Sequence, residues 1–121
     1  SLETSKRELK QEDGMMNYEE RGKEKMEQII ISKDQAFKDF LVKRGLVKED
    51  TMRLGNLRDP DFLKGKHVFG ALSIHLASYA DKVTFAVLDK STGETLADWT
   101  VEDFEQRLIK FDTYQVRKLE E

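Results

Sequence analysis

Three short apolar runs separated by amphipathic segments restrict the fold of this chain more than any other feature. The runs lie at 27–31 (EQIII), 66–69 (KHVF) and 82–88 (KVTFAVL), and such runs are typical of buried strands. An amphipathic segment at 34–45 follows the first run, and another at 70–80 joins the second run to the third. Because parallel strands need crossovers of this kind, the pattern predicts a largely parallel sheet.

Residues at the ends of these segments set their limits. Asp34 stands in an N-cap position and Gly45 in a C-terminal position, so we expect a helix between them. Weaker strand patterns occur at 50–54 and at 110–117, and the second has the alternation of an edge strand. In the segment at 70–80 the apolar side of the predicted helix consists of Leu72, Leu76 and Ala80.

A last helix is expected after Thr100, because Asp103 follows it at the spacing of a cap. Trp99 before the cap is interpreted as a packing residue, and the helix is expected to carry Val101, Phe104, Leu108 and Ile109. The order of elements is then β-α-β-β-α-β-α-β. It predicts a single three-layer α/β domain, Rossmann-like, with about five mostly parallel strands flanked by helices.

The first 25 residues differ in composition from the rest. Residues 1–25 are dense in alternating charge, with Leu2, Leu9 and Met16 at seven-residue intervals. This stripe is too short to establish a coiled coil, so a frayed or partner-dependent helix, an ordered docking helix and sequence foreign to the domain all stay open. We therefore divide the chain into a charged N-terminal extension at 1–25, flexible or helical, and an α/β domain at 26–121.

Charge and composition exclude several classes of function. The formal net charge of −3 gives no basic field for binding long nucleic acid, although one local pocket could still hold a small anion. Cysteine is absent, which excludes disulfides, thiolate metal sites and cysteine nucleophiles. No apolar run is long enough to span a membrane and no leader is recognisable, so we expect a cytoplasmic protein.

Two loops at the carboxyl ends of predicted strands carry the groups best suited to a ligand. Ser32 and Lys33 follow the first strand and supply a hydroxyl and a cation. Gly70 and Ala71 open the predicted helix at 70–80, where backbone N–H groups would attract an anion such as phosphate. Ligands collect at this edge of an open sheet, so the two loops predict a modest phosphate pocket.

The predicted helix also carries a serine and a histidine. Ser73, expected near its third position, could form a local hydrogen bond or contact a ligand. His75 could lie on the less apolar helix face or act as a general acid/base or phosphate ligand. His67 is expected to be exposed on its strand. Two histidines at this spacing without a carboxylate cluster make a poor metal site, so we expect no metal and no cofactor.

Three segments, at 30–46 (IISKDQAFKDFLVKRGL), 63–78 (LKGKHVFGALSIHLAS) and 111–116 (FDTYQV), together resemble a small type III CRISPR-associated accessory family related to ring nucleases. The middle segment is the most specific, because it matches the family pattern Gly-x-Leu-x-x-His-Leu-Ala without a gap. The chain departs from the family pattern at four places. It has Lys33-Asp34 in place of Arg-His, Phe40 in place of Trp, Lys66 in place of Asp and Ser73 in place of Pro.

The resemblance implies a role in antiviral CRISPR signalling, as a homodimer that binds and cleaves cyclic oligoadenylate, with cyclic tetra-adenylate as the ring. Cleavage would need no metal, because the 2′-OH of the ring attacks the adjacent phosphodiester. His75 would then be the acid/base, and Ser32, Lys33, Gly70, Ala71 and Ser73 would bind the ligand, although Ser73 has no counterpart in the family. The alternative is a non-catalytic nucleotide-sensing or protein-interaction module.

Overall fold

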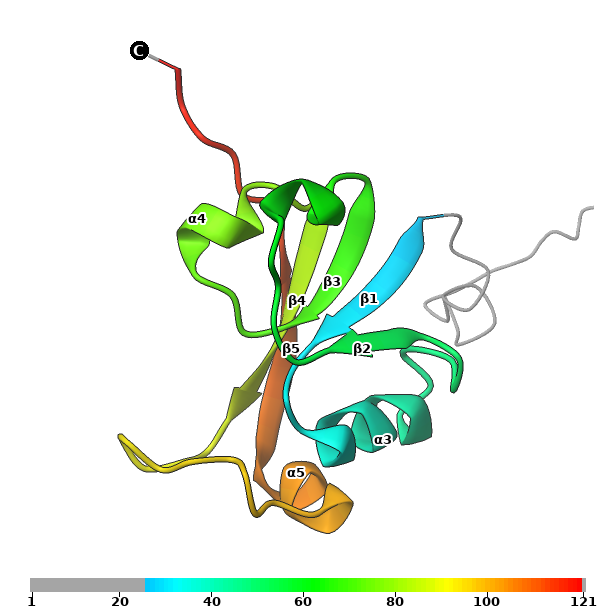
Figure 1. Cartoon of the computed structure of the whole chain (residues 1–121). Helices are drawn as coiled ribbons and strands as arrows, with labels where there is room; N and C mark the ends of the chain where they lie inside the picture. Colours follow the sequence, from blue (N-terminus) through cyan, green and yellow to red (C-terminus); the bar gives the residue numbers. More distant parts are fainter. Residues whose placement is uncertain (1–25, 121) are drawn as a thin grey trace, which may run out of the picture.

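A five-stranded sheet forms the centre of the computed structural model, which describes residues 26–120 (Figure 1). The strand order is β2-β1-β3-β4-β5, and the first three pairings are parallel whereas β4 and β5 are antiparallel. The strands are β1 (Glu27–Ile31), β2 (Met52–Leu54), β3 (Lys66–Gly70), β4 (Lys82–Leu88) and β5 (Leu108–Tyr114). The prediction of a mostly parallel α/β sheet of about five strands is confirmed.

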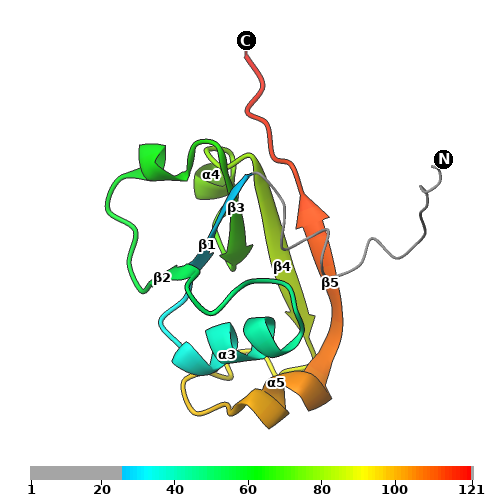
Figure 2. The same ribbon diagram turned by 90° about the vertical axis from the view of Figure 1, so that its right-hand side faces the viewer.

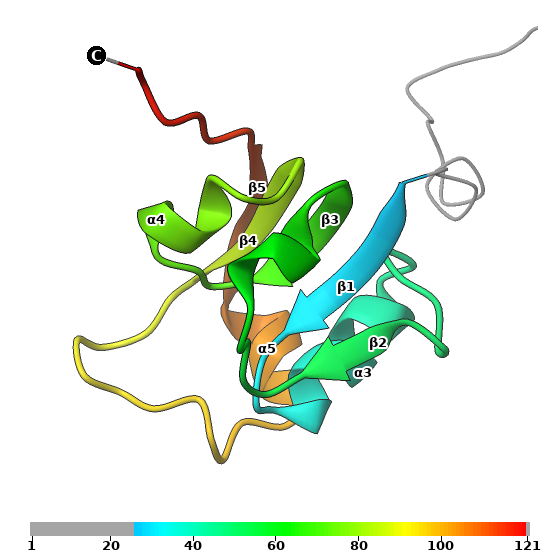
Figure 3. The ribbon, with the colours of Figure 1, turned by 45° about the horizontal axis from the view of Figure 1, so that its top comes forward.

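Helices flank the sheet, and two apolar clusters hold them against it. The helical elements are α3 (Gln35–Lys43), η1 (Pro60–Leu63), α4 (Ile74–Ala77) and α5 (Val101–Arg107). Helices α3 and α5 pack with Ile30 and Phe69 in one cluster, whereas η1 and the end of α4 pack with Ile29 and Val68 in the other. Because neighbouring residues of a strand point to opposite faces, the two clusters lie on the two faces of the sheet. Figures 2 and 3 show α3 and α5 side by side, apart from η1 and α4.

Helix α3 lies where the sequence predicted it. Its apolar side buries Phe37, Phe40 and Leu41. Asp34 is the N-cap residue, although its side chain makes no capping hydrogen bond. At the other end Gly45 adopts φ 77° and donates its N–H to the carbonyl oxygen of Val42, which ends the helix as expected.

The cap at Thr100 is also confirmed, but the helix behind it is shorter than predicted. Thr100 Oγ1 accepts the N–H of Asp103 at 3.2 Å, and Asp103 Oδ2 accepts the N–H of Thr100 at 2.9 Å. The helix ends at Arg107, and Leu108 already begins β5, which extends to Tyr114 instead of residue 117. A packing role for Trp99 fits its burial, with its ring 5.1 Å from that of Phe104.

The predicted helix at 70–80 is wrong over most of its length. Gly70 is the last residue of β3, and α4 contains only Ile74–Ala77. Ser73 is therefore the N-cap and not the third helical residue, and its Oγ accepts the N–H of Leu76 at 3.3 Å. Leu72 and Ala80, which were predicted to lie on the apolar side of a longer helix, still pack against the core cluster that contains Ala77. The spacing of these apolar residues therefore also fits one short helical turn.

The expectation that His67 is exposed is wrong as well. Strand β3 lies between β1 and β4, and helical elements pack on both faces of the sheet, so β3 is an interior strand with both faces covered. The His67 side chain is buried, forms a hydrogen bond between Nε2 and Thr84 Oγ1 of 2.7 Å and stacks on the Phe69 ring at 4.4 Å. Its imidazole is part of the interior of the sheet.

Two further observations concern the N-terminal segment and the helices. The predicted N-terminal extension at 1–25 lies outside the described residues. None of the helices found between residues 26 and 120 has the length and apolar character needed to cross a membrane.

Candidate functional site

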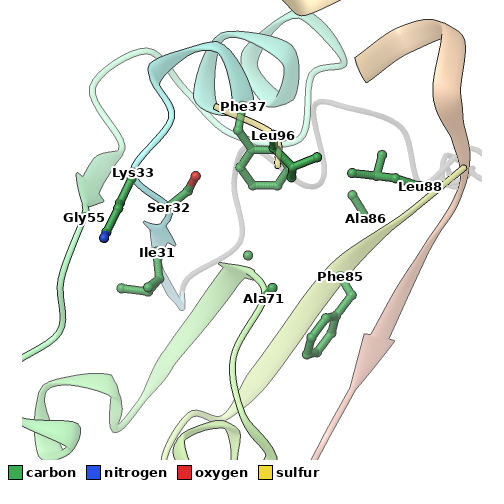
Figure 4. Close-up of a pocket in the computed structure, with 11 residues that line it drawn as sticks. Ile31, Ser32, Lys33, Phe37, Gly55, Ala71, Phe85, Ala86, Leu88 and Leu96 are labelled. Carbon is green, nitrogen blue, oxygen red and sulfur yellow. The ribbon is translucent and has the colours of Figure 1, made fainter. Parts of the chain in front are cut away.

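A cavity of about 280 Å³ lies at the carboxyl ends of β1 and β3 (Figure 4). Ser32 and Lys33 from the loop after β1 line it, together with Gly70 and Ala71 at the end of β3. The prediction that these two loops converge at one edge of the sheet is therefore confirmed. Phe37, Gly55 and Leu96 come from segments outside the sheet and contribute further parts of the wall.

The topology explains why a cavity forms at this place. Strands β1 and β3 are neighbours, but the chain leaves β1 toward β2 on one side and leaves β3 toward β4 on the other. The loops that follow the two strands therefore run in opposite directions, away from the boundary between β1 and β3. This reversal of strand order is the position where open α/β sheets usually bind their ligands.

A second cause is the different length of the paired strands. β3 pairs with β4 only from His67↔Lys82 to Phe69↔Thr84, whereas β4 runs on to Leu88. Residues 85–88 therefore pair with β5 alone, and their other edge faces the cavity. Phe85, Ala86 and Leu88 supply an apolar wall from this stretch.

Gly70 is required by the close approach of β3 to β1. Its φ is +143°, a conformation that side-chain-bearing residues rarely adopt. A Cβ atom at this position would overlap the carbonyl oxygen of Ile31, its register partner on β1. Because the helix begins only at Ile74, the N–H groups of Gly70 and Ala71 are not at a helix start, contrary to expectation. Any anion held here would interact with the strand end itself.

Hydrogen bonds hold the loop after β1 in place. Ser32 Oγ accepts the N–H of Asp34 at 3.1 Å, and the Ser32 carbonyl oxygen accepts Nη1 of Arg53 at 3.1 Å. The Ser32 N–H in turn donates to the Leu54 carbonyl oxygen at 2.9 Å. A hydroxyl that accepts one hydrogen bond keeps its own proton for donation, so Ser32 suits an anionic ligand.

Lys33 is the cation beside this loop. Its side chain is exposed and runs along Gly55, and Figure 4 shows its amino group pointing away from the apolar wall around Phe85. Lys33 is nevertheless among the residues that line the cavity. The site thus combines an apolar interior with a polar rim.

The other two predicted site residues do not line the cavity. Ser73 caps α4, which agrees with the prediction that its hydroxyl forms a local hydrogen bond. His75 lies exposed on the same short helix, with its ring edge-on to Tyr79 at a centroid distance of 5.6 Å. Neither side chain is among the residues around the cavity. Of the six candidates, four therefore come together and two stay apart from them.

An ion pair fixes the segment that brings Leu96 to the cavity. Arg107 donates two hydrogen bonds to the Glu94 carboxylate, at 2.7 and 3.1 Å, and its guanidinium lies 4.5 Å from the centre of the Trp99 ring. The bonds from Arg107, and then one from the backbone of Ser91, lower the pKa of Glu94 from 4.5 to about 2. This segment is thereby attached to α5.

Sequence reasoning missed the contribution of β4 and of Leu96. The available signal was the length of the apolar run at 82–88, which exceeds that of the run before it. A strand that extends beyond the end of its neighbour leaves one of its edges without a partner strand, and a cavity can form beside that edge. Nothing in the local sequence around Leu96 indicates its position, because the Glu94–Arg107 contact joins residues 13 positions apart on different elements.

Neither a search for metal-binding groups nor the comparisons with known proteins assign a further ligand or a family to the chain. Among residues 26–120, no group of three His, Asp or Glu side chains is arranged to hold a metal ion. No family model matches the chain. Neither a curated protein nor a solved structure matches it.

Proposed function

We propose that this protein binds an adenine nucleotide of a cyclic oligoadenylate in the cavity between β1, β3 and β4. The observation that carries the proposal is the convergence of the Ser32–Lys33 loop and the Gly70–Ala71 corner on one cavity at the reversal of strand order. This arrangement also supports a Rossmann-like description of the domain. The resemblance to the type III CRISPR-associated family supports adenylate as the class of ligand.

The two parts of the cavity suit the two parts of a nucleotide. Phe37, Phe85 and Leu96 form apolar surfaces against which a base can pack. Ser32 Oγ and the charged Lys33 side chain lie on the rim, where they can reach a phosphate. We therefore orient the base inward and the phosphate toward the loop after β1.

The volume limits how much of the ligand enters. At about 280 Å³ the cavity is near the lower end of ligand pockets, which range from about 300 to 1,000 Å³. It suits one nucleotide unit, and the rest of a four-nucleotide ring would extend outside. We expect the affinity to depend on one inserted base and its adjoining phosphate.

Isothermal titration calorimetry with cyclic tetra-adenylate tests the binding. Ala71→Leu places a larger side chain in the cavity, and we expect it to weaken binding at least about tenfold. Ala97→Leu is the matched control, because Ala97 is exposed and does not line the cavity. Lys33→Ala should also weaken binding about tenfold or more through loss of a charge-assisted hydrogen bond. Absence of saturable binding, or equal affinity of both leucine variants, would refute the proposal.

Ring cleavage is the second candidate function, favoured by the gapless match of the segment from Gly70 to Ala77. The 2′-OH of the ring is the nucleophile and attacks the neighbouring phosphorus; the bond to the 5′-oxygen breaks and leaves a linear product with a cyclic phosphate end. The protein has only to orient the groups and stabilise the developing charge. Lys33 is the cation of the cavity rim suited to that charge.

Cleavage is tested by incubating the ring with excess protein in EDTA and separating the products by chromatography. Linear product would establish a metal-independent nuclease, whereas an intact ring with normal binding would leave a nucleotide-sensing module. His75→Ala decides the role of the histidine. A loss of turnover of about 10²-fold with unchanged affinity would assign general acid/base chemistry to α4. Unchanged turnover would remove His75 from the reaction.

A further inference from the structure

The last strand of the sheet has an open edge. β5 pairs with β4 on one side, and on its other side no strand from residues 26–120 is bonded to it (Figure 2). Two of its larger side chains are exposed, Ile109 at 62% and Tyr114 at 50%. An open edge of this kind is a template for pairing with another strand.

We propose that β5 pairs with β5 of a second copy of this chain, in antiparallel orientation about a twofold axis, so that one sheet continues through both copies. Opposed residues of an antiparallel pair project to the same face, and a one-residue slip would place side chains on the wrong face. The twofold axis therefore passes through a residue position. Phe111 is the middle residue of the seven in β5, so an axis there pairs the strand over its whole length.

Charges on the strand select the same register. Lys110 and Asp112 flank Phe111 and lie on one face, since Lys110 Nζ is 3.5 Å from Asp112 Oδ2 within the chain. An axis at Phe111 sets Lys110 of each copy against Asp112 of the other, which forms two opposite-charge pairs. An axis moved to Lys110 or to Asp112 would oppose like charges and shorten the ladder. The longest register is thus also the one with complementary charge.

The exposed apolar side chains are covered in this register too. Ile109 opposes Thr113 of the other copy, and Tyr114 opposes Leu108. The cavity is lined by residues from β1, β3, β4, α3 and the loops but by none from β5. Pairing through β5 is therefore independent of nucleotide binding, and each can fail without the other.

Sedimentation equilibrium of the full chain over a concentration series tests the proposal. The chain has a mass of 14.1 kDa, and we expect the weight-average mass to rise toward twice that value. Lys110→Glu alone and Asp112→Lys alone each replace both attractive pairs by repulsive ones, so each should weaken the dimer about tenfold or more. An equimolar mixture of the two variants restores opposite charge at both positions and should recover the dimer.

The mixture separates a specific register from general effects of charge. Lys64→Glu is the control, because the Lys64 side chain is 68% exposed and Lys64 ends η1 and is not part of β5; it should leave the dimer unchanged. Circular dichroism melts of each variant show that the fold is kept. A chain that stays monomeric at all concentrations would overturn the proposal. Single variants that dimerise as the unaltered protein does, or a mixture that does not recover, would overturn it as well.

Discussion

Replacing Gly70 with alanine tests the contact between β1 and β3, which forms the floor of the cavity. The substitution puts a Cβ atom into the carbonyl oxygen of Ile31 and imposes a φ of +143° on a residue with a side chain. Strain in such a conformation destabilises by about 1–3 kcal/mol, and the displacement of a packed neighbour adds about 1–3 kcal/mol. We expect the free energy of unfolding to fall by about 3 kcal/mol. For a domain of this size that lowers Tm by about 12–24 °C.

Gly65 provides the matched control for this measurement. Its φ is also positive, at +76°, but a Cβ atom there would meet nothing within 4 Å. Gly65→Ala therefore has only the conformational penalty, about 1 kcal/mol, or about 4–8 °C in Tm. Thermal and urea unfolding followed by circular dichroism give both values. Equal losses for the two variants would show that overlap with β1 contributes nothing, and the account of Gly70 would be wrong.

Three further substitutions test other contacts. The lowered pKa of Glu94 means that its ion pair with Arg107 stabilises the fold fully above about pH 4.5 and loses this effect as the pH falls through about 2. Glu94→Gln should therefore lower Tm at pH 7 and make little difference at pH 2; a deficit that is the same at both values would contradict this. Thr100→Ala removes the helix cap and should reduce stability by about 1 kcal/mol in urea unfolding, whereas Thr100→Ser should be nearly neutral. Thr84→Val removes the hydroxyl that bonds both His67 and Thr113 and should reduce stability by about 1–3 kcal/mol, and a neutral result would show that these two bonds are dispensable.

The strands and the helix caps could be predicted because their causes are local. Ile29 and Ile30 form a short β-branched run whose two faces are both buried in the structure. Thr100 and Asp103 satisfy each other within one helical turn. No information from distant parts of the chain is needed for either pattern.

The segment after β3 could not be predicted in this way. The spacing of Leu72, Leu76 and Ala80 fits a helix, but it fits a loop with one helical turn equally well. What decides between them is the pairing of Gly70 with Ile31, a contact between strands that are distant in sequence. His67 was assigned wrongly for the same kind of reason, since its burial depends on β3 being an interior strand.

The position of the cavity could be predicted from the sequence, but only some of the residues that line it could be. Ser32 and Gly70 each follow an apolar strand, so the general rule for parallel sheets places them at one edge. The rule does not say which strand extends beyond the end of its neighbour, and Phe85 was missed for that reason. The placement of His75 outside the cavity depends on the shortness of α4, which the sequence pattern does not indicate.

The order of the strands in the sheet has a consequence for the order of folding. The β3–β4 ladder joins residues 15 positions apart and the β4–β5 ladder joins residues 20 to 31 positions apart, whereas residues paired between β1 and β3 are 39 positions apart. Contacts between nearby segments form with less loss of chain entropy than distant ones. We therefore expect β3, β4, α5 and β5 to be organised in the folding transition state, and β1, α3 and β2 to be added to them afterwards.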